Sequence, residues 1–297
     1  MSADGPGKAI AWIDQPGPKG SWGNPDELAI PVSDRALLLA DGIFETLLVE
    51  AGVSCRLEEH LARWQRGAHL LAMAEPPAKG QVQKLIGEAV SRSGITGGAL
   101  RLNWSRAGGG PSGGPSGAGR GLDLPSEQSG RFWLQLNPYR PNFAPVRLFV
   151  SPTESRSATS LLSCCKTMAY GAAIQARRQA VAAGFDDALL PCSGAPHPGE
   201  LSCGTSANLL VLSSSGWITP PLASGCLPGV MRGLALQLGL AKEKVIGAAD
   251  LHASAGALLI NSLGCRPISQ LGDQPLPIAP EPEALWRQLL AAPGITT

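Results

Sequence analysis

The sequence predicts an α+β protein of two domains, and three observations support this. The chain has 297 residues, about twice the ~150 residues of one ordinary domain. Short apolar runs with strand composition alternate with longer stretches in which apolar residues recur at helical spacing. Charged residues make up only 16% of the chain and the net charge is +1. We therefore expect a folded, soluble chain with no general attraction to nucleic acid or to an anionic membrane.

The N-terminal domain is predicted to be a small α/β unit covering residues 1–139. Its helix at 55–74 has apolar residues at helical spacing, namely Leu57, Leu61, Trp64, Ala68 and Leu71. A second helix at 80–94 ends at a glycine. The expected strands are 9–14, 27–33, 42–52, 99–106 and 131–139.

A linker is predicted at 140–146, where two prolines occur within seven residues. The larger C-terminal domain then covers residues 147–297. Gly184 closes its first long helix, and Pro228 with Gly229 opens a later one. The expected helices are 167–184, 227–240 and 283–292, and the expected strands are 146–152, 186–191, 207–212, 217–222 and 257–263.

Residues 107–121 form a low-complexity segment of glycine, proline and serine. Such a composition cannot pack a core, so we expect a long loop within the N-terminal domain. An inert surface insertion and a flap over a site fit this segment equally well.

The cysteines and histidines do not indicate a disulfide framework or a metal site. The seven cysteines include no C-x-x-C pair, and the four histidines form no H-E-x-x-H pattern. No apolar run approaches the ~20 residues of a membrane-spanning helix, and the first residues lack the apolar stretch of a signal peptide. We expect a cytoplasmic protein with reduced, mostly buried cysteines.

Lys166 is the first candidate catalytic residue. It lies in the segment LLSCCKTMAY, where its neighbours are apolar or small. An apolar environment lowers the pKa of a lysine, which suits an amine that forms a Schiff base. The alternative is a surface lysine whose ammonium group extends into solvent.

A phosphate site is the second candidate feature. Residues 227–232 open a helix with Pro-Gly, and the free backbone N–H groups of a helix start can bind an anion. Ser262 follows a buried strand and offers a hydroxyl, while Arg63 on the helix at 55–74 offers a guanidinium fork. An ordinary helix start and an exposed helix arginine are the alternatives.

Taken in order, these motifs resemble the fold type IV pyridoxal-phosphate enzymes, which are the class IV aminotransferases. The resemblance covers about residues 8–275 and is carried by 33–52, 57–64, 165–190, 204–212, 226–232 and 260–268. It implies a small N-terminal domain and a larger C-terminal pseudo-barrel flanked by helices. It further implies a homodimer, and pyridoxal 5′-phosphate as the cofactor.

The resemblance also implies roles for individual residues. Lys166 would form the Schiff base and move the proton at the substrate's α-carbon. Arg63 would hold the cofactor phosphate, with the backbone of Val230 and Met231 and with Ser262. Phe44 and Glu45 would line the substrate side.

One position departs from the family pattern. Most members have a glutamate five residues before the asparagine that matches Asn208, and this glutamate faces the pyridine nitrogen. Here Cys203 occupies that position, and the nearest carboxylate is Glu200. On a regular strand Glu200 would point to the opposite face, so it can replace the missing glutamate only if the strand bulges. A thiol leaves the ring nitrogen largely neutral, which favours an elimination over an aminotransfer.

Two further segments resemble the aminodeoxychorismate lyase branch of the family. The sequence NSLGCRPI at 261–268 matches its loop, and residues 105–121 match its SRG-x-GGRG segment with an insertion. Arg106 and Arg120 are therefore candidates for binding substrate carboxylates. We expect a lyase that converts 4-amino-4-deoxychorismate to 4-aminobenzoate and pyruvate, in folate synthesis. The alternatives are an aminotransferase for branched-chain or D-amino acids, and a family member that has lost its activity.

Overall fold

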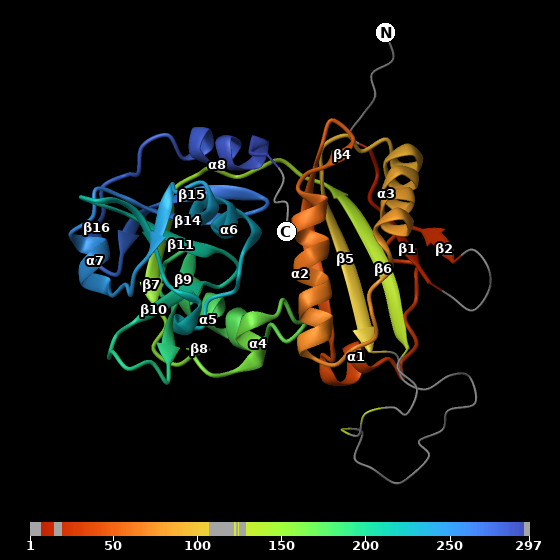
Figure 1. Ribbon diagram of the computed structural model, residues 1–297, viewed down its shortest axis with the longest axis horizontal. Coiled ribbons are helices and arrows are strands. Elements are labelled where there is room, and N and C mark those ends of the chain that lie inside the picture. The colour runs from red at the N-terminus through yellow and green to blue at the C-terminus, as the bar shows by residue number, and fades with distance from the viewer. Residues whose placement is uncertain (1–6, 15–19, 107–121, 123, 125–128, 294–297) are drawn as a thin grey trace. The chain divides into compact units, whose positions relative to one another are not determined.

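The computed structural model describes residues 7–14, 20–106, 122, 124 and 129–293. The chain divides into two compact units (Figure 1). The first comprises Met1–Arg140 together with Lys166–Ala169, and the second comprises Pro141–Cys165 and Tyr170–Thr297. Helices and strands occur in both units, which confirms the predicted α+β class.

The first unit contains an antiparallel sheet of six strands in the order β2-β1-β6-β5-β3-β4. Its strands are β1 (Ile10–Ile13), β2 (Ser21–Gly23), β3 (Gly42–Glu50), β4 (Val53–Ser54), β5 (Gly98–Arg106) and β6 (Gly130–Pro138). Its helices are α1 (Arg35–Leu39), α2 (Leu57–Leu70) and α3 (Lys79–Ser93).

One hydrophobic core joins this sheet to α2 and α3. Trp64 of α2 and Ile86 of α3 are buried in it with Leu100 and Leu134 of the sheet. Successive side chains of a strand point to opposite faces. Every second residue of β3 therefore points into the core, and the residues between them point to the other face of the sheet.

The strand expected at 27–33 is wrong. Residues 28–31 have no regular structure, and a turn follows in which the backbone N–H of Asp34 donates to the carbonyl of Pro31. The side chain of Asp34 then accepts from the backbone N–H of Ala36 and caps α1. Pro31 lacks the N–H group that a strand residue donates, and aspartate is favoured at the N-cap of a helix. Residues 27–33 therefore lead into a turn and then into α1 instead of forming a strand.

The second unit contains a sheet of ten strands (Figure 1). They are β7 (Val146–Val150), β8 (Arg156–Ser157), β9 (Asp187–Ser193), β10 (Leu201–Gly204), β11 (Asn208–Ser213), β12 (Gly216–Thr219), β13 (Ala241–Glu243), β14 (Ala257–Asn261), β15 (Gly264–Leu271) and β16 (Gln274–Pro275). Strand β10 pairs with both β9 and β11, so β10-β9-β7-β15-β14-β11 closes into a ring. This ring is the expected pseudo-barrel.

Helices pack around this ring. They are α4 (Leu161–Cys164), α5 (Gly171–Ala182), α6 (Val230–Gln237), α7 (Ala248–His252) and α8 (Pro282–Ala291), with a short 3-10 helix η1 (Leu222–Ser224). Helix α5 contacts β9, α6 contacts β14, α7 contacts β11 and α8 contacts β15. The residues after 263, which the sequence suggested as a loop, form β15 because Gly264 reverses directly into an antiparallel partner of β14.

No helix in the described part of the chain has the length and apolar character needed to cross a membrane.

Candidate active site

Backbone pairing with the edge of β3 fixes the position of Lys166. The backbone N–H of Phe44 donates to the carbonyl of Lys166 at 2.9 Å, and the N–H of Met168 donates to the carbonyl of Gly42 at 2.9 Å. Residues Ile43 and Thr167 form an antiparallel bridge between these two bonds. Lys166 is thus held by a strand-like segment rather than by a flexible loop.

The side chain of Lys166 lies over the ring of Phe44. Its Nζ is 4.3 Å from the ring centroid, and Cζ of Arg101 lies 3.5 Å from the same centroid. Two cations therefore share one aromatic ring, whose electron-rich face attracts positive charge. Nε of Arg101 donates to Oδ1 of Asn103 at 2.7 Å, which orients the guanidinium.

Sequence analysis missed Arg101. Its pairing partner on β3 is Thr46, and Asn103 pairs with Phe44, so these four side chains share one face of the sheet. The signal was available in the strand at 99–106, where Arg101 and Asn103 alternate with the buried Leu100 and Leu102. Polar residues on every second position of a strand mark a face that does not belong to the core.

Glu45 points to the opposite face of β3 from Phe44. It is 1% exposed and contacts two residues of α2. Nε and Nη2 of Arg63 donate to its two oxygens at 2.8 and 2.5 Å, and Nδ1 of His60 lies 2.6 Å from Oε2. Phe44 and Glu45 therefore do not line one surface, because adjacent strand residues alternate. Two nitrogens of Arg63 donate to Glu45.

Electrostatics in this buried group depend on the competition between burial and charge pairing. Burial on its own would raise the pKa of Glu45, but Arg63 and His60 outweigh it and hold the pKa at about 2. Burial lowers the pKa of His60 despite its hydrogen bond to Glu45. The group therefore consists of a carboxylate, a guanidinium and a neutral imidazole near neutral pH.

Arg106, expected at the substrate carboxylates, is 5% exposed and binds groups of its own unit. Nε donates to Asp41 at 3.1 Å, while Nη1 and Nη2 donate to the carbonyls of Ala72 and Leu71 at 2.7 Å each. This arrangement favours a structural role. Arg120 and the loop at 107–121 lie outside the described residues.

In the second unit, the predicted phosphate residues Val230 and Met231 begin α6 and are buried. The N-cap residue Gly229 supplies no side chain to the helix start. A Cβ at this position would lie 1.9 Å from Oδ1 of Asn208, whose Nδ2 donates to the carbonyl of Leu227 at 2.9 Å. The first N–H groups of a helix have no partner within it, so this start can accept an anion.

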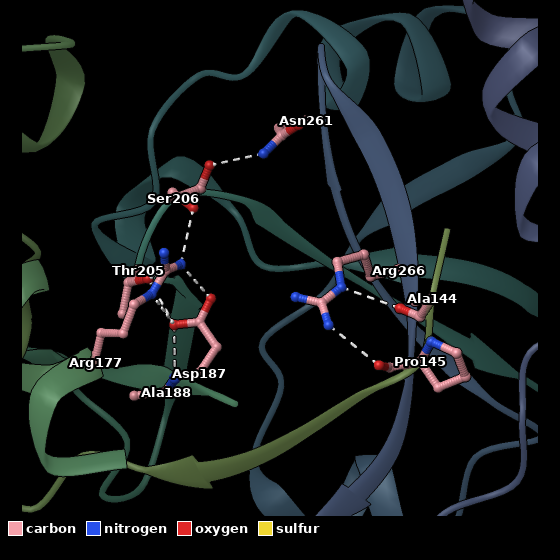
Figure 2. Close-up of polar contacts among 9 residues, drawn as sticks. All are labelled: Ala144, Pro145, Arg177, Asp187, Ala188, Thr205, Ser206, Asn261 and Arg266. Atoms are coloured by element: carbon pink, nitrogen blue, oxygen red, sulfur yellow. Dashed lines mark hydrogen bonds and ion pairs between the residues drawn. The ribbon is translucent and has the colours of Figure 1, made fainter. Parts of the chain in front are cut away.

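Ser262 lies in the turn between β14 and β15. Asn261 holds this turn by accepting from the backbone N–H of Leu263 at 2.8 Å. Nδ2 of Asn261 also donates to the carbonyl of Ser206 at 3.2 Å, which ties the turn to the loop between β10 and β11 (Figure 2). Ser262 therefore lies in a turn that two hydrogen bonds of Asn261 hold in place.

Arg177 of α5 also contacts the loop between β10 and β11. Its Nη2 contacts Oδ2 of the buried Asp187 at 2.6 Å, Oγ1 of Thr205 at 2.7 Å and Oγ of Ser206 at 3.2 Å. Figure 2 shows these residues converging on Asp187, and also shows Arg266 reaching the carbonyls of residues 144 and 145 that precede β7. The negative charge of Asp187 is thus neutralised by Arg177.

Strand β10 is irregular between Leu201 and Cys203. Leu201 lies opposite Pro191 while Cys203 lies opposite Leu190, so two steps on β10 match one step on β9. This is the pattern of a β-bulge. The bulge that the sequence analysis required for Glu200 is therefore present.

Comparison with known proteins defines the family. Residues 42–271 match the family model of the class IV amino-transferases, and the chain therefore belongs to that family. The chain is 25% identical over 222 residues to a protein of Methanocaldococcus jannaschii named "Putative branched-chain-amino-acid aminotransferase", a match that covers 73% of this chain and 71% of the relative. It is 39% identical over 75 residues to the bifunctional aminodeoxychorismate lyase / D-amino acid transaminase of Mycobacterium tuberculosis, covering 25% of this chain and 26% of the relative.

A solved structure confirms the fold. The pyridoxal-phosphate-bound form of a hypothetical aminotransferase from Mycobacterium tuberculosis superposes with a TM-score of 0.77, at 21% identity, over 96% of this chain and 99% of that chain. The predicted fold type and the family resemblance are confirmed, and the family's cofactor is pyridoxal phosphate.

The described residues fit this cofactor in three respects. Lys166 supplies an amine on an ordered backbone, α6 begins without a side-chain cap, and Oε2 of Glu200 is a buried oxygen with no hydrogen-bond partner among the described residues. These three groups match an aldehyde, a phosphate and a basic ring nitrogen. Within the described ranges, no group of three or more His, Cys, Asp or Glu side chains is placed to hold a metal ion.

Replacing Glu45 tests the buried group of the first unit. Glu45→Gln leaves the charge of Arg63 buried without a counter-charge, which should cost about 3 kcal/mol of unfolding free energy. Urea unfolding at pH 7.5 measures this loss. The control is Glu88→Gln, which removes a half-buried partner of the exposed Arg92 and should change stability by less than about 0.5 kcal/mol. Equal stability of the two variants would contradict the assignment.

The stability of the protein should fall as the pH is lowered. His60 has a folded-state pKa below its ordinary 6.5, so the unfolded chain binds a proton first and stability is lost as the pH falls below about 6.5. A further loss should begin below the ordinary 4.5 of Glu45 and continue toward about 2. Urea unfolding between pH 7.5 and 5 measures the first step, and His60→Gln should flatten it. A variant profile parallel to that of the wild type would show that His60 is not responsible.

Proposed function

We propose that this protein is a pyridoxal-phosphate-dependent lyase that converts 4-amino-4-deoxychorismate to 4-aminobenzoate and pyruvate, a reaction of folate synthesis. The observation that carries the proposal is the turn at residues 261–263, whose Asn-Ser-Leu sequence resembles the lyase branch and which Asn261 holds closed. The 39% identity to a bifunctional lyase and transaminase over 75 residues supports the same choice.

The proposed cofactor contacts come from both groups of residues described above. Lys166 binds the cofactor aldehyde through its amine. The backbone of Val230 and Met231 at the start of α6 binds the phosphate, together with Ser262 and with the guanidinium of Arg63. Phe44 orients the lysine amine through its ring.

When bound, pyridoxal phosphate withdraws electrons from the substrate carbon that carries the amino group. Lys166, whose amine would hold the cofactor, would also serve as the base that takes the proton from that carbon. The resulting ammonium of Lys166 would return a proton to the departing enolpyruvyl group, which leaves as pyruvate. The two products together contain every atom of the substrate, so the reaction needs neither water nor an oxidant.

An aminotransferase acting on branched-chain or D-amino acids through the same lysine is the second candidate. It is favoured by the match of 73% of the chain to the archaeal relative. Arg101 also supplies a guanidinium beside Phe44, and α-carboxylates of amino acids pair well with such a fork.

The deciding experiment incubates the protein with pyridoxal phosphate and 4-amino-4-deoxychorismate, and follows both products. We expect equal amounts of 4-aminobenzoate and pyruvate. Lys166→Ala should give neither product and should lose the visible absorbance of lysine-bound cofactor, because the substitution removes the amine that binds the cofactor aldehyde.

The matched control is Lys84→Ala, which removes an exposed lysine of α3 and should retain both products and the absorbance band. Absence of both products with the wild-type protein would contradict the lyase assignment. In that case, pyruvate or glutamate formation from amino-acid and keto-acid pairs would identify the aminotransferase.

We also propose that the protein is a homodimer. Around α1, the apolar side chains of Val32, Leu37 and Leu38 are 80%, 62% and 64% exposed. Large apolar side chains with this degree of exposure favour an interface. Light scattering should give twice the mass of the 30.6 kDa chain, and Leu38→Glu should shift the protein toward monomer. A wild-type monomer at micromolar concentration would contradict this proposal.

A further inference from the structure

Glu200 has a buried carboxylate, and one of its oxygens has no hydrogen-bond partner among the described residues. The residue is 4% exposed and immediately precedes β10. Its Oε1 accepts a hydrogen bond from Oγ of Ser224. Its Oε2 is fully buried and has no partner among the described residues. A buried acceptor without a donor costs about 1–3 kcal/mol, so this oxygen indicates a donor from outside the described residues.

The bulge in β10 places Glu200 on the same face of the strand as Cys203. Residues that pair across two strands share a face, and Pro191 and Leu190 are adjacent on β9. Leu201 and Cys203 therefore point to opposite faces. Glu200 precedes Leu201 and so shares the face of Cys203. The core assignments agree, because Leu201 packs in the same cluster as Leu189, and Cys203 in that of Leu190.

Glu200 and Cys203 both contact the segment that leads into α6. Glu200 binds Ser224 in this segment, and Cys203 packs in one cluster with Cys226. Four residues after Cys226 the helix begins at Val230. The orphaned oxygen therefore belongs to the same part of the second unit as the proposed phosphate contact.

The three acidic groups of this region, Cys203, Asp187 and Glu200, differ in their partners. Burial raises the pKa of the Cys203 thiol, so it is uncharged near neutral pH. The nearby carboxylate of Asp187 is paired with Arg177 and accepts from Thr205. Glu200 takes part in no ion pair within the described part of the chain. A protonated pyridine nitrogen is a charged N–H donor, and its strongest partner is a carboxylate.

We infer that Oε2 of Glu200 accepts a hydrogen bond from the ring nitrogen of the bound pyridoxal phosphate and keeps that nitrogen protonated. The carboxylate of Glu200 thereby takes the role of the glutamate that most family members have at the position of Cys203, three residues later in the chain. This inference rests on the cofactor binding of the proposed function but not on the choice of substrate.

The inference changes the significance of Cys203. Sequence analysis took the thiol as evidence for a neutral ring and hence for elimination. A protonated ring withdraws electrons more strongly and serves both elimination and aminotransfer. The lyase proposal then depends on the turn at 261–263 and on the relatives, and the protein gains the chemical capacity for an aminotransfer side reaction.

The test uses the full chain reconstituted with pyridoxal phosphate labelled with ¹⁵N in the ring, without substrate. A protonated pyridine nitrogen resonates well upfield of a neutral one. We expect the wild type to show the protonated position at pH 7.5, and Glu200→Gln to show the neutral position with about tenfold weaker cofactor binding. Glutamine keeps an oxygen for Ser224, so the fold should survive.

Two controls separate this role from a structural one. Glu283→Gln removes an exposed carboxylate of α8 and should keep the protonated signal. Cys203→Ser should also keep it, since the thiol is not the acceptor. A neutral ring nitrogen in the wild type, or a protonated one in Glu200→Gln, would overturn the inference. Neither result depends on whether 4-aminobenzoate is produced, so failure of the lyase assignment remains distinguishable.

Discussion

The pairing of residues 166–168 with the edge of β3 is the constraint on which the candidate site depends. Two backbone hydrogen bonds of 2.9 Å hold this segment against β3, with an isolated antiparallel bridge between Ile43 and Thr167. They bring the amine of Lys166 over the ring of Phe44, beside the guanidinium of Arg101. A reactive amine needs a fixed direction, and here the direction comes from the backbone rather than from side-chain packing.

The two faces of β3 carry different groups of side chains. The face with Phe44 carries the cations, while the face with Glu45 carries a buried group in which Arg63 is held by two hydrogen bonds. In the second unit the buried carboxylate of Asp187 is likewise neutralised by Arg177. Glu200 is different, because one of its oxygens is buried with no partner among the described residues. We assign this oxygen to the bound cofactor.

The α+β fold class could be predicted from sequence periodicity, whereas the pseudo-barrel and the cofactor were implied by the resemblance of the ordered motifs to a known family. It could not foresee the pair between Glu45 and Arg63, because a strand residue and a helix residue 18 positions apart meet only in the packed unit. It missed Arg101, whose partner Phe44 is on another strand. The face of Glu200 was likewise undecidable, since one extra residue in a strand reverses every side chain beyond it. The error at 27–33 arose from reading apolar composition without giving weight to Pro31.

The most direct test of the account is to identify the lysine that binds the cofactor. Reducing the protein with borohydride in the presence of pyridoxal phosphate fixes the cofactor to the lysine that holds it, and peptide mass spectrometry then locates the label. The account predicts a single label on Lys166, in the peptide that pairs with β3. A label on any other lysine, or none at all, would contradict the assignment of the active site.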